Sequence, residues 1–452
     1  MRSTGWPPAL RATTIVAGVA SVAMSVTPAC GQSEPAKRSE ADPVTFQQGT
    51  DAPDTLTGEW GGLRTRLRDD GLDLAAGYVS ETAWNASGGM RERVVETGQF
   101  SFAATIDTAK LIGLTGGTFQ GTITFRRGHD LGADAGLGVL QQVQEVYGRG
   151  QTWRLTQLWY QQTFAEGRAD IKIGRLTQGE DFAAFSCQLQ NLSFCGSPPG
   201  NLAGDYWYNW PISQWGVRGR LRNDRFYAMV GAYEVNPRNL ENAFTFGRFH
   251  GATGVLIPAE IGFTPRLGAS RLPGSYRFGG WYNTAEANDV GLDINGNPQA
   301  VTGLAPLRRT GRYGFYLQLQ QQLSGSVEEG KAGPKVRNGL IAYLNITQTD
   351  RHTTVTDNQV AAGLTYAGLI PFRPHDDVTF AVARTNVNAN ALLGLAKGQA
   401  RPDAEYAAEF AYCIHTIRWL TLRPNLQYVV NPGGFTQAKD VVVLGLKASV
   451  AL

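Results

Sequence analysis

The segment between Leu176 and Ser213 combines carboxylates with aromatic rings, and these side-chain types could bind a small solute. The segment contains Glu180, Asp181, Trp207 and Trp210. Carboxylates can replace water at hydroxyl groups, and indole rings offer flat faces to C–H surfaces. A solute that carries both kinds of surface could therefore bind here, if the fold brings the segment to a channel or cleft.

Two cysteines in the same segment, Cys187 and Cys195, have only seven residues between them. In an oxidising compartment this spacing favours a local disulfide that would stiffen the segment. Cys413 is left single, and we interpret it as a small strand residue without chemistry.

Other chemical motifs are weak. Asp293, Asn295 and Asn297 resemble a calcium loop, but no acidic residue stands at the twelfth position, so a plain turn is favoured. Neither a phosphate-binding glycine loop nor a G-x-S-x-G nucleophile motif occurs. No metal-ligand spacing relates the five histidines His129, His250, His352, His375 and His415. We therefore expect no catalytic residues, metal or cofactor.

The composition indicates how such residues are positioned. The 452 residues include 41 basic and 38 acidic ones, which argues against a basic nucleic-acid-binding protein. Glycine is frequent at 55 residues, and aromatic residues make up 10%. This combination is typical of many strands joined by glycine-containing turns, with exposed aromatic residues.

The N-terminus resembles an export signal. Arg2 and Arg11 precede an apolar stretch of small residues, which predicts a secretory signal peptide over residues 1–30. Cys30 stands where a lipoprotein cysteine would, but Pro28 breaks the usual pattern, so lipidation is disfavoured. No later window of 18 apolar residues occurs. The pattern predicts a periplasmic, secreted or outer-membrane protein of a bacterium with two membranes.

The rest of the chain divides into three parts. Residues 31–54 are polar and predict a disordered linker. Residues 55–70 predict a short amphipathic periplasmic helix capped by Thr57, and residues 71–452 alternate with period two. The apolar face of the helix contains Trp60, Leu63 and Leu67.

Alternation separates an apolar face from a polar face in each predicted strand. One clear case has Tyr313, Phe315 and Leu317 opposite arginine and glutamine side chains. A soluble β-sandwich also alternates, but its core favours aliphatic residues, whereas here tyrosines such as Tyr406 and Tyr412 lie near strand ends. Aromatic girdles of a membrane barrel explain that distribution.

The strand count supports a closed barrel. An even number of strands with alternating short turns and long loops is typical of outer-membrane barrels. We therefore expect a 16-stranded antiparallel transmembrane β-barrel. The sixteen predicted strands cover residues 72–84, 98–107, 118–127, 152–164, 168–175, 213–222, 225–235, 253–264, 275–284, 311–323, 338–348, 357–368, 377–386, 404–415, 417–429 and 440–452. The long outer loops are expected at 128–151, 176–212, 236–252, 285–310 and 387–403.

Several motifs resemble those of the carbohydrate-selective porin (OprB) family. They are LTGEWGGL at 56–63, GRGQTWR at 148–154, the segments 174–176 and 179–182, WYNWP at 207–211, the segments 236–237 and 272–274, RPNLQY at 423–428 and NPGG at 431–434. The resemblance extends from about residue 55 to the end. It implies a 16-stranded barrel through which neutral sugars diffuse. The chain ends in Leu452, where such barrels usually end in Phe.

The resemblance gives the polar strand faces a role as a channel wall. We expect the loop after the fifth strand to fold inward as a constriction, with an ordinary rim loop as the alternative. Glu81 and Arg126 would line the narrowest part opposite this loop and face each other. Arg175 would reach the lumen only if Gly174 marks a bulge or the strand has ended before it. By alternation, Trp281 falls on the polar face of its strand and would point into the lumen. Two interpretations are equally favoured: its ring stacks on a passing sugar, or it packs against another lumen residue.

The leading functional hypothesis is an outer-membrane porin for sugars such as glucose. Its partners would be mono- and oligosaccharides, outer-membrane lipid and lipopolysaccharide, with the protein a monomer or homotrimer. One alternative is a general or small-organic-solute porin. A barrel-shaped lipid hydrolase is another, for which His415, Glu409 and Cys413 share a polar strand face.

Overall fold

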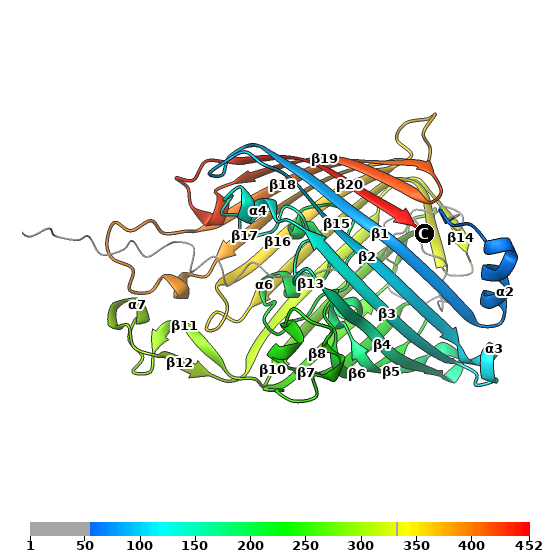
Figure 1. Ribbon diagram of the computed structural model, residues 1–452, viewed down its shortest axis with the longest axis horizontal. Helices are drawn as coiled ribbons and strands as arrows, with labels where there is room; N and C mark the ends of the chain where they lie inside the picture. The colour runs from blue at the N-terminus through cyan, green and yellow to red at the C-terminus, as the bar shows by residue number, and fades with distance from the viewer. Residues whose placement is uncertain (1–54, 331–332) are drawn as a thin grey trace, which may run out of the picture.

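The computed structural model describes residues 55–330 and 333–452. The expected signal peptide, the linker and Cys30 lie outside these residues. The main sheet of the described chain has eighteen strands, of which β9 and β14 only extend turns. The other sixteen form a barrel that closes where β1 pairs antiparallel with β20 as well as with β2 (Figure 1). The sixteen-stranded barrel expected from alternation is confirmed.

The strand positions agree closely with those expected from alternation. The barrel strands are β1 (Leu72–Ser87), β2 (Val94–Asp107), β3 (Gly117–Gly128), β4 (Trp153–Phe164), β5 (Ala169–Leu176), β6 (Gln214–Arg222), β7 (Phe226–Val235), β8 (Gly254–Phe263), β10 (Leu272–Asn283), β13 (Arg312–Gln322), β15 (Gly333–Thr349), β16 (Thr356–Ala367), β17 (Asp377–Val387), β18 (Ala404–Ile417), β19 (Leu420–Val430) and β20 (Val441–Ala451). Strands that follow one another along the wall are paired antiparallel, and so are the first and last strands, β1 and β20.

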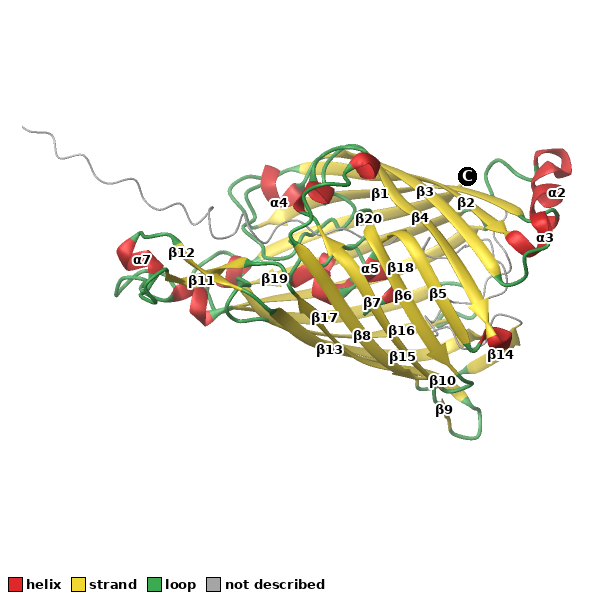
Figure 2. Cartoon of the chain, turned by 90° about the horizontal axis from the view of Figure 1, so that it is seen from below, coloured by secondary structure: helices red, strands yellow, loops and turns green. Residues whose placement is uncertain are grey.

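Four further strands lie outside the barrel wall. They are β9 (Arg266–Leu267), β11 (Ala287–Asp293), β12 (Pro306–Arg309) and β14 (Ser326–Gly330). β14 pairs with the start of β15, which explains why the connection after residue 323 is longer than a simple turn. β11 and β12 form a separate hairpin that projects from one end of the barrel (Figure 2).

The two ends of the barrel differ in their connections. The end with tight connections, here called the turn end, carries the links at 165–168, 223–225 and 418–419 and the C-terminus (Figure 1). The opposite end, here called the loop end, carries the long connections. These are residues 129–152, 177–213, 236–253, 284–311 and 388–403.

The barrel presents apolar side chains outward and polar side chains inward. Along β13, Tyr313 and Phe315 are exposed, whereas Arg312 and Gln318 are buried. Exposed side chains on an outer face and buried polar ones on an inner face are the pattern of a transmembrane barrel. The outer apolar belt also includes Val217, Leu221, Val230, Ile261, Phe278, Leu364, Phe380, Val382, Phe410, Leu444 and Leu446.

Helices are short in the described part of the chain, and none of them is long and apolar enough to span a membrane. The α-helices are α2 (Leu63–Asp69), α3 (Thr108–Ile112), α4 (Leu131–Asp134), α5 (Gln178–Asp181), α6 (Pro198–Leu202) and α7 (Gln299–Thr302). The 3-10 turns are η1 (Trp60–Gly62), η2 (Ala165–Gly167), η3 (Leu192–Phe194), η4 (Pro237–Leu240), η5 (Thr245–Gly247), η6 (Ala389–Leu392) and η7 (Pro432–Gly434).

The expected N-terminal helix is present as α2, but its N-cap and its buried face are formed by other residues than predicted. Its N-cap is the left-handed Gly62, not Thr57. Trp60 and Leu63 are exposed, whereas Arg64 is buried. The Arg64 guanidinium donates a hydrogen bond to the carbonyl of Leu452 at 2.9 Å. A single cation therefore attaches the helix to the C-terminal end of the barrel.

Candidate functional site

The long connection between β5 and β6 folds into the barrel interior. We call it the second inner loop (residues 177–213), because another connection, described next, enters the lumen earlier in the chain. The second inner loop contains α5, η3 and α6. The backbone N–H groups of Gln190 and Asn191 both donate to the carboxylate of Glu409 on the wall, each at 2.8 Å. The inward-folded loop expected from the sequence is therefore present, and it narrows the lumen.

The connection between β3 and β4 also enters the lumen, although the sequence analysis treats it as an outer loop. In this first inner loop, residues 129–152, the N–H of Val146 donates to the Glu81 carboxylate at 3.1 Å. The Gln144 amide donates to the Glu81 carbonyl at 2.7 Å. The loop has no periodic pattern that could reveal its path, although its glutamine-rich centre at 141–144 suits a polar interior.

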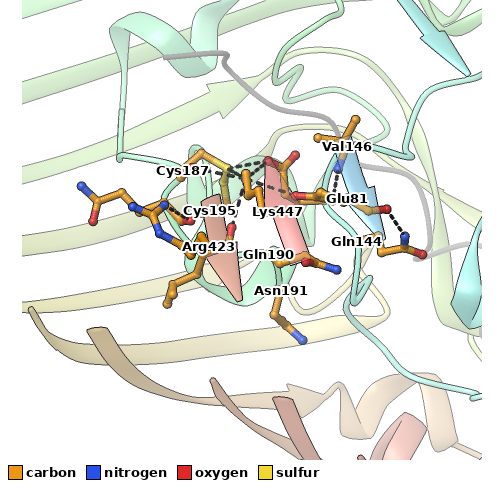
Figure 3. Close-up of polar contacts among 12 residues, drawn as sticks. Glu81, Gln144, Val146, Cys187, Gln190, Asn191, Cys195, Arg423 and Lys447 are labelled. Carbon is orange, nitrogen blue, oxygen red and sulfur yellow. Dashed lines mark hydrogen bonds and ion pairs between the residues drawn. A yellow bond between two sulfur atoms is a disulfide. The ribbon is translucent and has the colours of Figure 1, made fainter. Parts of the chain in front are cut away.

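Glu81, Glu145 and Lys447 form an ionic centre where the two inner loops meet the wall. Lys447 Nζ lies 3.1 Å from Glu81 Oε1 and also forms an ion pair with Glu145 of the first inner loop. Figure 3 shows Lys447 between Glu81 and the disulfide that Cys187 and Cys195 form in the second inner loop. One ammonium group is therefore shared by two carboxylates in this part of the lumen.

Arg126 lies on the same stretch of wall as Glu81, so the expected arrangement across the channel is not what the structure has. Glu81 is on β1 and Arg126 on β3, with only β2 between them. Arg126 donates to the side chain of Gln99 at 2.7 Å and to the carbonyl of Gly148 at 2.6 Å. Its Nη2 has no hydrogen-bond partner among the described residues. One buried donor of Arg126 is therefore left without a hydrogen bond in the described part of the chain.

Two further buried arginines, Arg149 and Arg154, lie near Arg126. Arg149 donates to the carbonyl of Gly204, and Arg154 donates to the carbonyls of Arg149 and Asn239. These contacts hold the inner loops to backbone oxygens. Sequence parity did not reveal this group, because Arg149 belongs to a loop.

Arg175 points inward, as the expected irregularity at Gly174 requires. Gly174 has φ +137°, a backbone conformation that suits glycine. The Arg175 guanidinium donates to the Ser213 carbonyl at 2.6 Å and to Thr245 Oγ1 at 3.0 Å. Its donors therefore bind the base of the second inner loop and not the open lumen.

Glu180 and Asp181 lie in α5 and differ in environment. Asp181 is 3.1 Å from Lys172 Nζ and 3.5 Å from Arg218. Glu180 accepts a hydrogen bond from Gln157 at 2.7 Å. Burial raises the pKa of the Glu180 carboxyl to about 7, although Lys172 and the Gln157 hydrogen bond oppose this shift. Of the two, Glu180 is the group that can change charge near neutral pH.

Trp207 and Trp281 pack against each other, with ring centroids 5.1 Å apart. Trp281 also stacks on Tyr316, and its indole N–H donates to the Tyr206 hydroxyl at 2.9 Å. Trp207 is 0% exposed and Trp281 is 5% exposed. In this arrangement their ring faces are covered, so the packing alternative describes Trp281, and the cluster anchors the second inner loop to β10 and β13.

A cavity lies between the second inner loop and the wall near the turn end, and the sequence analysis missed it. Phe185 of the loop and Tyr343 of β15 meet there with ring centroids 4.8 Å apart and planes at 55°. The Tyr343 hydroxyl has no hydrogen-bond partner in the described chain. Tyr343 alternates in step with the buried Ile341 and Asn345 on β15, but nothing in the sequence pairs it with Phe185. The lining is completed by polar side chains and by apolar ones. The polar residues are Ser186, Gln188, Gln320, Thr365 and Thr379, and the apolar residues are Leu189, Phe194 and Ile341.

Comparison with known protein families and individual proteins shows that this chain is similar to porins. A family model described as "Carbohydrate-selective porin, OprB family" matches residues 91–452. "Porin B" of Pseudomonas aeruginosa is 41% identical over 415 residues, which is 87% of this chain and 90% of that protein. "Putative porin QuiX" of Acinetobacter baylyi is 32% identical over 419 residues, covering 86% of this chain and 91% of that protein.

A solved structure is similar throughout the barrel. The high-pH structure of Pseudomonas putida OprB superposes with a TM-score of 0.83 and 40% sequence identity. The similarity covers 89% of this chain and all of that chain.

Proposed function

We propose a route for sugars through this barrel from the premise that the chain belongs to the carbohydrate-selective porin, OprB family. As a member of that family, it is a bacterial outer-membrane porin for carbohydrates. Short turns of such barrels face the periplasm and long loops face outward. Sugars would therefore enter at the loop end and leave at the turn end.

The cavity at Phe185 and Tyr343 is the observation that carries the proposed sugar contact. A pyranose ring has C–H faces that suit aromatic rings and hydroxyls that need donors and acceptors. The cavity offers two rings at an angle, an unpartnered tyrosine hydroxyl, and the amides of Gln188 and Gln320. It lies beside the second inner loop, so a sugar that passes this loop would meet it on the way to the turn end.

The ionic centre supports selectivity for neutral solutes. Lys447 partly compensates Glu81 and Glu145, and Arg126 adds a second cation on the same stretch of wall. Opposite charges close together give little net field along the axis, while their hydrogen-bonding groups stay fixed. A small ion would therefore gain little, and a sugar could exchange water for fixed partners. We assign Glu81 and Arg126 to the pathway on this basis.

Single-channel recording with added sugars tests the contact at the cavity. Tyr343→Leu removes the hydroxyl and the aromatic face, and we expect weaker block of the ion current by glucose and maltose. Tyr366→Leu is the matched control, because Tyr366 is 38% exposed on the lipid-facing side of the neighbouring strand β16. Equal sugar block in Tyr343→Leu, Tyr366→Leu and the unmodified protein would show that the cavity does not contact sugars.

A general porin would pass solutes by size alone. Liposome swelling with sugars, amino acids and organic acids of matched size separates the two channel types. We expect the sugars to enter fastest, because the lumen offers paired charges and amides without a single-sign field. Equal swelling rates at matched size would favour the general porin.

A lipid hydrolase is the alternative from another class, and the geometry at Cys413 disfavours it. A catalytic triad needs a base that bonds the nucleophile through one ring nitrogen and the orienting acid through the other. Here Cys413 Sγ and Asp377 Oδ2 lie 3.1 Å and 3.8 Å from the same nitrogen, His415 Nε2. The relatives are channels. We therefore propose that the chain is not an enzyme, and phospholipid turnover lost in His415→Ala would contradict this.

A further inference from the structure

We propose that Asp377, Cys413 and His415 form a binding site for a thiophilic divalent cation such as Zn²⁺ at the turn end of the lumen. Asp377 is the first residue of β17 and pairs directly with Cys413 on β18. His415 follows two residues later on the same inward face of β18. The site therefore spans two adjacent strands, which explains why spacing along the sequence did not reveal it.

The three ligand atoms converge on one point. Cys413 Sγ lies 3.1 Å from His415 Nε2, and Asp377 Oδ2 lies 3.8 Å from the same nitrogen. All three atoms lie within 4.8 Å of one another. Tetrahedral zinc with its usual bond lengths to S, N and O separates its ligand atoms by roughly 3.4–3.6 Å. Small side-chain rotations would bring the present atoms to that spacing.

The state of the Asp377 carboxylate is an independent indication of a ligand. Asp377 is 1% exposed, and its Oδ1 accepts a hydrogen bond from Thr379 at 3.3 Å. Its Oδ2 points toward Cys413 and His415 and has no hydrogen-bond partner among the described residues. His415 Nε2 and Arg423 Nη2 each lie 3.8 Å from this oxygen, which is an ion-pair distance but too long for a hydrogen bond. A cation held with the thiolate and imidazole would give the buried oxygen a direct partner.

The ligand types select the class of metal. A thiolate, an imidazole and a carboxylate form a mixed site that suits Zn²⁺ and the softer Cd²⁺, and it is a poor match for Mg²⁺ or Ca²⁺. Three protein ligands leave one position for water or a solute. The site lies beside the second inner loop, because Arg423 donates to the Gln188 carbonyl and has its Nη2 3.8 Å from Asp377 Oδ2.

Arg423 allows the direction of a change in cation affinity to be predicted, which a nonspecific site would not allow. Its positive charge close to Asp377 opposes a cation at the site. Arg423→Gln should therefore raise the affinity for Cd²⁺ several-fold. Replacement of a ligand by Cys413→Ser, His415→Gln or Asp377→Asn should lower it at least tenfold.

The test titrates Cd²⁺ and Zn²⁺ into the detergent-purified, full-length barrel. Thiolate-to-Cd²⁺ charge-transfer absorption reports ligation by Cys413 and does not depend on transport. His129→Ala is the matched control, because His129 Nδ1 lies 3.2 Å from Asp134 in an exposed pair without a thiol. We expect stoichiometric absorption in the unmodified protein and His129→Ala, and its loss in Cys413→Ser. The shift of the barrel band on heating checks that each variant is folded.

The opposite results would overturn the metal site. These are absence of the absorption band in the folded unmodified protein, or equal affinities in His129→Ala, His415→Gln and Asp377→Asn. A second readout is block of the channel current by Zn²⁺ added at the turn end. It relies on the proposed function, whereas the absorption does not, so the two hypotheses can fail separately.

Discussion

Lys447 is the residue that allows Glu81 and Glu145 to lie together in the lumen. Two buried carboxylates repel each other unless a cation lies between them. Lys447→Met should leave both without their shared partner, and we expect a higher preference for cations over anions at neutral pH. The reversal potential across a KCl gradient measures this preference. Lys397→Met, at an exposed position of the loop between β17 and β18, should leave it unchanged. An equal shift in both variants would contradict a local centre.

Arg126 and Arg127 form a matched pair for testing sugar contact. Arg126 is buried and points inward, whereas the Arg127 side chain is half exposed on the outer face. Loss of one hydrogen bond to a charged group weakens binding by about 1.5 kcal/mol, or about tenfold. Arg126→Ala should therefore raise the sugar concentration for half block of the current about tenfold. Arg127→Ala should leave that concentration within about twofold of the unmodified value.

Sequence parity predicted which side chains enter the lumen but not what they contact. Glu81, Arg126 and Trp281 all point inward, because period-two alternation depends only on local backbone geometry. Their partners come from distant segments: Lys447 on β20, Gly148 in the first inner loop and Tyr206 in the second. Such pairings depend on how the loops fold, which local patterns do not encode.

At the scale of elements, strands were predictable and the inner loops only partly so. Each strand must alternate because one face meets lipid and the other meets water. The second inner loop was expected from the resemblance, because it follows the fifth strand, and its carboxylates, indole rings and cysteine pair fitted that expectation. The first inner loop, residues 129–152, carries no comparable signal, although it contributes Glu145 and Arg149 to the lumen.

The second inner loop should make the channel sensitive to pH through Glu180. Burial raises the pKa of Glu180 to about 7, so its carboxyl is neutral at pH 5 and ionised at pH 9. Raising the pH through this range adds one negative charge to α5 and should increase cation preference. Glu180→Gln should reduce this change in reversal potential.

Asp181→Asn provides the control for the titration of Glu180. The ion pairs with Lys172 and Arg218 lower the pKa of Asp181 against the effect of its burial, so Asp181 stays ionised over the same range. Asp181→Asn should shift the selectivity at every pH but keep the pH-dependent step. If the pH-dependent change in reversal potential were as large in Glu180→Gln as in the unmodified protein, the titrating group would be another residue.

At the scale of the whole molecule, the barrel is closed by pairing between its first and last strands. β1 pairs with β20 from Gly77↔Ala451 to Asn85↔Val443, which leaves no open edge in the barrel wall. The terminal Leu452 contributes through its backbone, because its N–H donates to Ala76 and its carbonyl accepts from Arg64.

The outer belt gives a test of the complete architecture. Val382 lies at the middle of β17, is 44% exposed and has alanines as its partners on both neighbouring strands, so it should face the centre of the lipid layer. A lysine on the lipid face near the bilayer midplane destabilises a barrel by about 2–4 kcal/mol. Val382→Lys should lower the free energy of unfolding in lipid vesicles by that amount. Leu304→Lys, in the projecting loop between α7 and β12, should change it by less than about 0.5 kcal/mol. Equal effects of the two lysines would place β17 in water and contradict a membrane-spanning barrel.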